Sequence, residues 1–176
     1  DTFFYAGKIS LDLRNNGLTK KIKSDNTPVS NGDIEVNKII TSKLKEITPN
    51  IPIVSEETSD NKLIENLKDF WLVDPIDGTY DYINNLEEFT INAGLIVDNT
   101  PVAGLIFAPA KNRMFYSYGD NFAYEIINGE NIKLGSSKNF DINSIKFVSY
   151  SNKLKPEIEI IHKKLNVKSF TRMKSS

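Results

Sequence analysis

The chain has 176 residues, of which 39% are hydrophobic, and a formal net charge of −1. This is enough for one large domain with a real core, or for one domain and part of another. The near-neutral charge offers no basic surface for nucleic acid. The absence of cysteine excludes disulfides, thiol catalysis and cysteine-type zinc sites. The single histidine, His162, is distant in sequence from the acidic motifs, which argues against a Ser-His-Asp triad, and we expect it on an exposed helix surface.

No stretch of 18 consecutive apolar residues and no signal-type apolar region occurs in the sequence. We therefore predict a cytoplasmic protein without a transmembrane segment. Peripheral contact with the inner face of the membrane stays open, as does a homodimer, because composition determines neither.

The first 50 residues predict two helices separated by a polar segment. Residues 3–13 have an amphipathic pattern, and residues 19–30 are polar and basic. Ser30 is placed to cap the second helix, with Asp33 as the acid of a capping box. From the residues alone, Asp33 either only caps this helix or also takes part in a site. The apolar stripe of the second helix consists of Val36, Ile40, Leu44 and Ile47.

Two apolar runs end in paired acids. Residues 71–79 read Trp-Leu-Val-Asp-Pro-Ile-Asp-Gly-Thr, which is typical of a buried strand whose carboxyl end opens into a loop. Residues 52–57, Pro-Ile-Val-Ser-Glu-Glu, have the same form. Residues 59–69 between them carry apolar side chains at helical spacing. A strand-helix-strand arrangement would bring the two acidic strand ends side by side.

We therefore predict a shared hard cation bound by Glu56, Asp74 and Asp77. This cation would be Mg²⁺, with Mn²⁺ as a substitute. Neighbouring carboxylates repel one another unless a cation or proton lies between them, and oxygen ligands favour such a metal over zinc. This site suits hydrolysis of a phosphate ester, where one metal ion lowers the pKa of a bound water and a second stabilises the leaving alkoxide. The alternative is that Glu56 and Glu57 are solvated loop acids.

The spacing of the acids argues against two other classes of protein. Phosphatases that form a phospho-aspartate carry Asp-x-Asp-x-Thr with acids two apart, whereas Asp74 and Asp77 are three apart. The EF-hand pattern Asp-x-Asp-x-Asp-Gly is also absent.

The second half of the chain predicts an antiparallel sheet followed by the start of a parallel α/β unit. A short helix is expected at residues 80–85. Strands with tight turns between them are expected at residues 90–97, 102–107, 114–118, 123–127 and 131–134. The aromatic residues of this region are expected to pack against one another rather than to stack on bases. After a polar linker at 135–144, a strand at 145–150, a helix at 156–165 and a strand at 167–171 are expected.

The two acidic motifs resemble the signature of the inositol monophosphatase superfamily of Mg²⁺-dependent, lithium-sensitive phosphatases. The similarity continues through residues 25–30 with Asp33, and through 88–92, 101–104 and 107–109. Asp-Asn-Thr-Pro-Val and Glu-Phe-Thr-Ile-Asn look most like the 3′(2′),5′-bisphosphate nucleotidases of that superfamily. These enzymes remove the 3′-phosphate of adenosine 3′,5′-bisphosphate, leave AMP, and support sulfate assimilation.

The resemblance implies a layered α-β-α-β-α sugar-phosphatase fold. Residues 1–140 would form an α+β domain with an antiparallel sheet that binds metal and phosphate. Residues 141–176 would begin a second α/β domain that is incomplete.

The resemblance also implies roles for individual residues. Glu56, Asp74 and Asp77 would be metal ligands, together with the backbone carbonyl of Ile76. Thr79, paired with Asp33, would help to deprotonate the attacking water, with Glu56 nearby. Glu57 would stand behind the ligands. The substrate phosphate would be held by Ile76, Asp77, Gly78 and Thr79.

The sequence departs from the superfamily at one point. A further Asp ligand comes from a Trp-Asp-x-Ala segment in the superfamily, and the 176 residues contain no such segment. The end of the chain, residues 172–176, looks like the approach to the superfamily's Gly-Ser-Ser stretch, so we expect a truncated form or a portion of a longer protein. An inositol or sugar monophosphate phosphatase and a non-catalytic phosphate-binding fragment stay open as alternatives.

Overall fold

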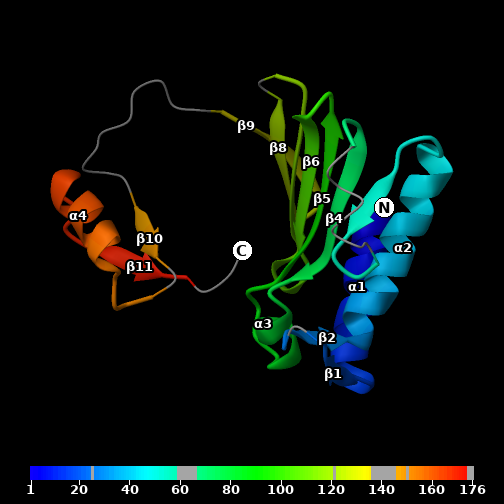
Figure 1. Ribbon diagram of the computed structural model, residues 1–176, viewed down its shortest axis with the longest axis horizontal. Coiled ribbons are helices and arrows are strands. Elements are labelled where there is room, and N and C mark those ends of the chain that lie inside the picture. The colour runs from blue at the N-terminus through cyan, green and yellow to red at the C-terminus, as the bar shows by residue number, and fades with distance from the viewer. Residues whose placement is uncertain (25, 59–66, 121, 136–145, 150, 174–176) are drawn as a thin grey trace. The chain divides into compact units, whose positions relative to one another are not determined.

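The computed structural model describes residues 1–24, 26–58, 67–120, 122–135, 146–149 and 151–173 (Figure 1). The chain forms two compact units, Asp1–Leu134 and Gly135–Ser176. The helix expected at 59–69 and the linker expected at 135–144 lie mostly outside the described residues. None of the helices in the described ranges combines the length and the apolarity needed to cross a bilayer.

The first unit begins with two helices that pack against each other, α1 (Thr2–Asn16) and α2 (Asn31–Ile47). Both predicted helices are confirmed. Ser30 caps α2 as expected, because its hydroxyl accepts hydrogen bonds from the first turn while the Asp33 carboxylate accepts one from the Ser30 N–H. The predicted stripe is buried at Val36, Ile40 and Leu44. Ile47 is exposed, contrary to the prediction, because α2 ends at this residue.

The polar segment between the helices forms a hairpin that was not predicted. β1 (Lys20–Ile22) and β2 (Pro28–Ser30) pair antiparallel, and the backbone N–H of Lys23 donates to the carbonyl of Thr27 at 2.8 Å. All of β1 is exposed. A strand without a buried face lacks the alternation by which sequence reveals strands, so this hairpin was missed.

A seven-stranded sheet forms the centre of the first unit, in the order β3-β4-β5-β6-β7-β8-β9. β3 and β4 are parallel, and each following pair is antiparallel. The strands are β3 (Ile53–Ser55), β4 (Phe70–Asp77), β5 (Thr90–Val97), β6 (Thr100–Ala108), β7 (Arg113–Tyr118), β8 (Ala123–Ile127) and β9 (Glu130–Leu134). Two short helical segments, α3 (Thr79–Ile83) and η2 (Pro109–Lys111), connect them. The predicted antiparallel sheet is confirmed.

The hydrophobic core lies between the helices and the sheet face on which they pack (Figure 1). Its fully buried members include Val36 and Ile40 of α2 and Val73 of β4, because a helix stripe and alternate strand residues face each other. On β7 and β8, the rings of Tyr116 and Tyr124 stack at 5.0 Å between centroids, which confirms the packing role expected for the aromatic residues.

The second unit contains a strand, a helix and a strand: β10 (Phe147–Ser149), α4 (Pro156–Lys164) and β11 (Phe170–Arg172). β10 and β11 pair in parallel, as the sequence predicted. The expectation of an exposed His162 is wrong. Its ring lies 5.9 Å from that of Phe147 and 5.4 Å from that of Phe170, so it is half-buried where α4 covers the strand pair.

Candidate metal and phosphate site

The structure brings Glu56 and Asp74 to the same edge of the sheet. β3 and β4 are parallel neighbours with Ser55 opposite Val73. The backbone N–H of Glu56 continues this ladder by donating to the carbonyl of Val73 at 3.2 Å. Parallel strands end on the same side of a sheet. Glu56, directly after β3, and Asp74, in β4, therefore lie near each other.

A β-bulge places Asp77 on the same face of the strand as Asp74. Residues three apart on a regular strand point to opposite faces. Here Asp74 is opposite Asn92 and Asp77 is opposite Thr90, so β4 uses two intervening residues where β5 uses one. The extra residue resets the alternation. The Asp-Pro-Ile-Asp spacing thus converges two carboxylates only because the strand is irregular at this point.

Asp74 is the least satisfied acid of the site. Its Oδ1 atom is buried and has no hydrogen-bond partner among the residues that the structure describes. Burial raises the pKa of the Asp74 carboxyl to about 7, and repulsion from the Glu56 and Asp77 carboxylates adds to this effect. A buried oxygen without a donor, next to two further acids, is a place where a cation would be stabilised.

Gly78 makes the turn from β4 into α3. Its φ of +91° lies in the left-handed region, and a Cβ atom at this position would lie 2.7 Å from the carbonyl oxygen of Glu88. Both the conformation and the close approach of the backbone require glycine. The turn directs Thr79 away from the sheet edge and toward α2.

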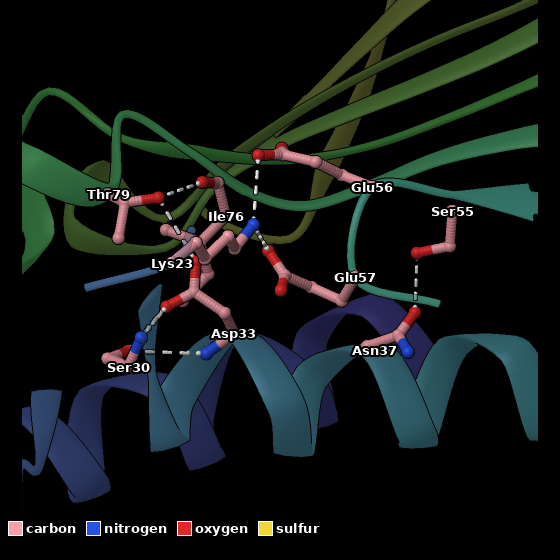
Figure 2. Close-up of polar contacts among 9 residues, drawn as sticks. All are labelled: Lys23, Ser30, Asp33, Asn37, Ser55, Glu56, Glu57, Ile76 and Thr79. Atoms are coloured by element: carbon pink, nitrogen blue, oxygen red, sulfur yellow. Dashed lines mark hydrogen bonds and ion pairs between the residues drawn. The ribbon is translucent and has the colours of Figure 1, made fainter. Parts of the chain in front are cut away.

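The Thr79 hydroxyl meets Asp33, as Figure 2 shows. Thr79 Oγ1 lies 3.1 Å from Asp33 Oδ1 and 3.0 Å from the carbonyl oxygen of Ile76. The other oxygen of Asp33, Oδ2, accepts hydrogen bonds from the Ser30 N–H at 2.8 Å and from the Ser30 hydroxyl. Asp33 therefore caps α2 and also contacts the site. Burial raises the pKa of its carboxyl, although the hydrogen bonds from Ser30 and Thr79 act in the opposite direction.

Lys23, which sequence reasoning did not single out, lies between Glu56 and Glu57 (Figure 2). Its Nζ is 2.7 Å from Glu57 Oε1 and 3.4 Å from Glu56 Oε1. The Glu57 side chain is only 4% exposed, so the alternative that it is a solvated loop acid is wrong. The one available signal was the basic character of residues 19–30, which does not indicate what a lysine contacts.

A second contact that the sequence did not reveal fixes the end of β3. The Ser55 hydroxyl donates to Asn37 Oδ1 at 2.7 Å, and both residues are buried. This hydrogen bond ties α2 to the strand that carries Glu56. Asn37 lies among apolar stripe residues in the sequence, where a polar residue gives no indication of its partner.

The donor set of this edge fits a hard divalent cation. Glu56, Asp74 and Asp77 supply only oxygen atoms, which Mg²⁺ and Mn²⁺ prefer, and Asp74 presents an oxygen without a protein donor. Within the described ranges, no three acidic or histidine side chains already surround a common point as a finished ligand set. Glu56, one of the predicted ligands, instead forms an ion pair with Lys23.

The fold and site define a class of layered α/β proteins in which an acidic sheet edge, a left-handed glycine and a helix-capping Asp converge. The chain belongs to the inositol monophosphatase family, whose model matches residues 2–176. The family and the fold class predicted from sequence are thus confirmed.

Curated relatives support the family assignment. The chain is 39% identical over 119 residues to the 3′(2′),5′-bisphosphate nucleotidase CysQ of Aggregatibacter actinomycetemcomitans, covering 66% of this chain and 44% of the relative. It is 39% identical over 140 residues to the protein of the same name from Buchnera aphidicola, covering 78% of this chain and 51% of the relative. The chain therefore spans about half the length of these relatives.

Solved structures show the same fold. CysQ of Bacteroides thetaiotaomicron, described as a bacterial member of the inositol monophosphatase family, matches with a TM-score of 0.74 at 25% identity. The match covers 100% of this chain and 70% of that one. The IMPase of Thermotoga maritima matches with a TM-score of 0.75 at 20% identity, over 99% of this chain and 66% of the other, and supports the fold alone.

Proposed function

We propose that this protein is a Mg²⁺-dependent phosphatase that removes the 3′-phosphate of adenosine 3′,5′-bisphosphate and leaves AMP. The observation that carries the proposal is the buried Oδ1 atom of Asp74, which has no hydrogen-bond partner among the described residues and has Glu56 and Asp77 as acidic neighbours. The substrate is favoured by the relatives at 39% identity, which are named 3′(2′),5′-bisphosphate nucleotidases.

Glu56, Asp74, Asp77 and the carbonyl oxygen of Ile76 are the groups that would hold Mg²⁺. When bound, the metal supplies Lewis acidity, which makes a water molecule more acidic and offsets the charge of the phosphoryl oxygens. The Ile76 carbonyl oxygen lies 3.0 Å from Thr79 Oγ1, and when the Thr79 hydroxyl donates to Asp33 instead, the lone pairs of this carbonyl are free for a metal.

Thr79 and Asp33 would take the proton from the attacking water. When the Thr79 hydroxyl donates to Asp33 Oδ1, its lone pairs are free to accept a hydrogen bond from water. The proton then passes through the hydroxyl to Asp33, and burial raises the pKa of that carboxyl and so favours its acceptance of the proton. Gly78 and Thr79 would orient the phosphate through their backbone N–H groups.

The test is phosphate release by the full-length protein from adenosine 3′,5′-bisphosphate, with and without Mg²⁺. Asp77→Asn should lower kcat/KM on the order of 10³-fold, because one ligand of the metal-water site is lost. Asp12→Asn, on the exposed face of α1, is the matched control and should leave the rate unchanged.

Three outcomes would contradict the proposal. A wild-type protein that releases no phosphate with Mg²⁺ would exclude catalysis. An Asp77→Asn variant with full activity would exclude the proposed ligand set. A faster rate on inositol 1-phosphate than on adenosine 3′,5′-bisphosphate would assign the site to inositol phosphates instead.

A further inference from the structure

Lys23 contacts the two glutamates at the end of β3 unequally. The contact with Glu57 is a close, well-shielded ion pair, with 2.7 Å between Nζ and Oε1 and a Glu57 side chain that is 4% exposed. The contact with Glu56 is longer, at 3.4 Å, and the Glu56 side chain is 50% exposed. Ion pairs in water contribute little, whereas breaking a buried pair leaves an uncompensated charge. Glu57 is therefore the fixed partner of Lys23, and Glu56 is the exchangeable one.

The backbone around Lys23 keeps its ammonium group near this edge. Lys23 follows β1 and begins the turn of the hairpin, where its N–H donates to Thr27 at 2.8 Å and its carbonyl accepts from Asn26 at 3.0 Å. The hairpin also leads directly into Ser30 and the cap of α2. A lysine anchored at both its backbone and Glu57 cannot move far when Glu56 takes another partner.

Glu56 is also a neighbour of the acids of β4. Its backbone N–H donates to the carbonyl of Val73, the residue before Asp74, at 3.2 Å. Glu56 thus contacts the ammonium group of Lys23 and lies next to the acids of β4. A divalent cation that binds Glu56 and Asp74 has to compete with Lys23 for the Glu56 oxygens.

We infer that Lys23 is an internal counter-cation of this site. In the absence of metal it pairs with both Glu56 and Glu57. When a divalent cation binds, Lys23 releases Glu56 and stays paired with Glu57. Lys23 is a positioning residue in this role and does not contact the reacting atoms. The inference rests on the proposed metal site. It adds that the affinity for Mg²⁺ is set by a lysine and a glutamate that are not themselves ligands.

Two single substitutions should move the affinity in opposite directions. In titration calorimetry of the full-length protein with MgCl₂, Lys23→Met should bind Mg²⁺ at least about fivefold more tightly, because a competing charge is removed. Glu57→Gln should bind it at least about threefold more weakly, because Glu56 becomes the only carboxylate partner of Lys23. Lys23→Arg keeps the charge and should resemble the wild type.

Thermal unfolding supplies a second readout. Without Mg²⁺, Lys23→Met should have a lower Tm than the wild type, because Glu57 loses its counter-charge. The difference should shrink at saturating Mg²⁺, since the tighter-binding variant gains more stability from the ligand. The Lys23→Met measurements are sufficient if Glu57→Gln fails to fold.

An unchanged or weaker Mg²⁺ affinity in Lys23→Met would overturn the inference and leave Lys23 as a tether of the hairpin. An unchanged affinity in folded Glu57→Gln would overturn the anchoring role of Glu57. A wild-type protein that binds no Mg²⁺ would instead overturn the proposed metal site, and the inference with it. The two failures are therefore distinguishable.

Discussion

Asp33, which is buried, and Asp74, which is half-buried, are two acids of the same unit, and they differ in how their oxygens are used. Both oxygens of Asp33 accept hydrogen bonds, from Ser30 on one side and Thr79 on the other. Asp74 has a buried oxygen with no donor within the described part of the chain, and acids for neighbours. Burial raises the pKa of both carboxyls. The satisfied acid holds the structure and orients a hydroxyl, whereas the unsatisfied one is suited to a cation.

Gly78 lies between β4, which contains Asp74, and Thr79, which contacts Asp33. Its substitution should have the largest effect on stability. Gly78→Ala should lower the free energy of unfolding by about 3 kcal/mol, because the left-handed backbone is strained and the new Cβ clashes with the Glu88 carbonyl. Denaturant unfolding without Mg²⁺ measures this. Gly129→Ala is the matched control: φ there is +81° but nothing lies within 4 Å of a Cβ, so only about 1 kcal/mol should be lost. Equal losses in the two variants would contradict the role of the close approach.

Removing the satisfied acid should be the next most costly change. Asp33→Ala should lower the free energy of unfolding by about 2 kcal/mol, because the Ser30 N–H loses its acceptor and the capping box of α2 is broken. Asp33→Asn retains one acceptor oxygen and should lose less. Urea unfolding at neutral pH compares the two variants. If Asp33→Ala is as stable as the wild type, the cap does not contribute.

Asp74 should affect the free energy of unfolding in the opposite direction, because its ionised form destabilises the folded chain when no metal is bound. The folded pKa of Asp74 is about 7 against an ordinary 3.8, so between these values the folded chain binds a proton that the unfolded chain does not. Stability without Mg²⁺ should therefore fall as pH rises through this window, by about 1–2 kcal/mol after allowance for solvent screening. Unfolding at pH 5 and pH 8 measures the fall.

Asp74→Asn is the control for that pH effect. It should be more stable than the wild type at pH 8 without Mg²⁺, with a smaller difference at pH 5, because the amide carries no charge at either pH. A wild type whose stability rises with pH in this range, or a variant with the same pH dependence, would show that Asp74 is not the titrating acid.

An exposed ion pair should have the smallest effect. Lys43 and Glu46 on α2 approach to 2.6 Å, but their side chains are 43% and 68% exposed. Lys43→Ala should change the free energy of unfolding by less than about 0.5 kcal/mol, as thermal unfolding would show. A loss as large as that of Asp33→Ala would mean that charge itself, rather than burial, sets the contrast between the acids.

The sequence was informative where a residue acts through its immediate neighbours. Ser30 and Asp33 are three residues apart and form the predicted capping box. The strands of the main sheet follow apolar runs bounded by turns, so their order along the chain was predictable. The β1–β2 hairpin was not, because β1 is exposed throughout and has no buried face to mark it.

The sequence alone determined the two helices, the succession of strands and the family, because periodicity, capping and a long local motif are written in consecutive residues. Only the tertiary structure decided that a bulge in β4 turns Asp74 and Asp77 to one face, that Thr79 reaches Asp33, and that Lys23 lies between Glu56 and Glu57. Those pairings join residues between 33 and 46 positions apart, except for the bulge. Strand register and the packing of separate elements set them, and neither has a local signature.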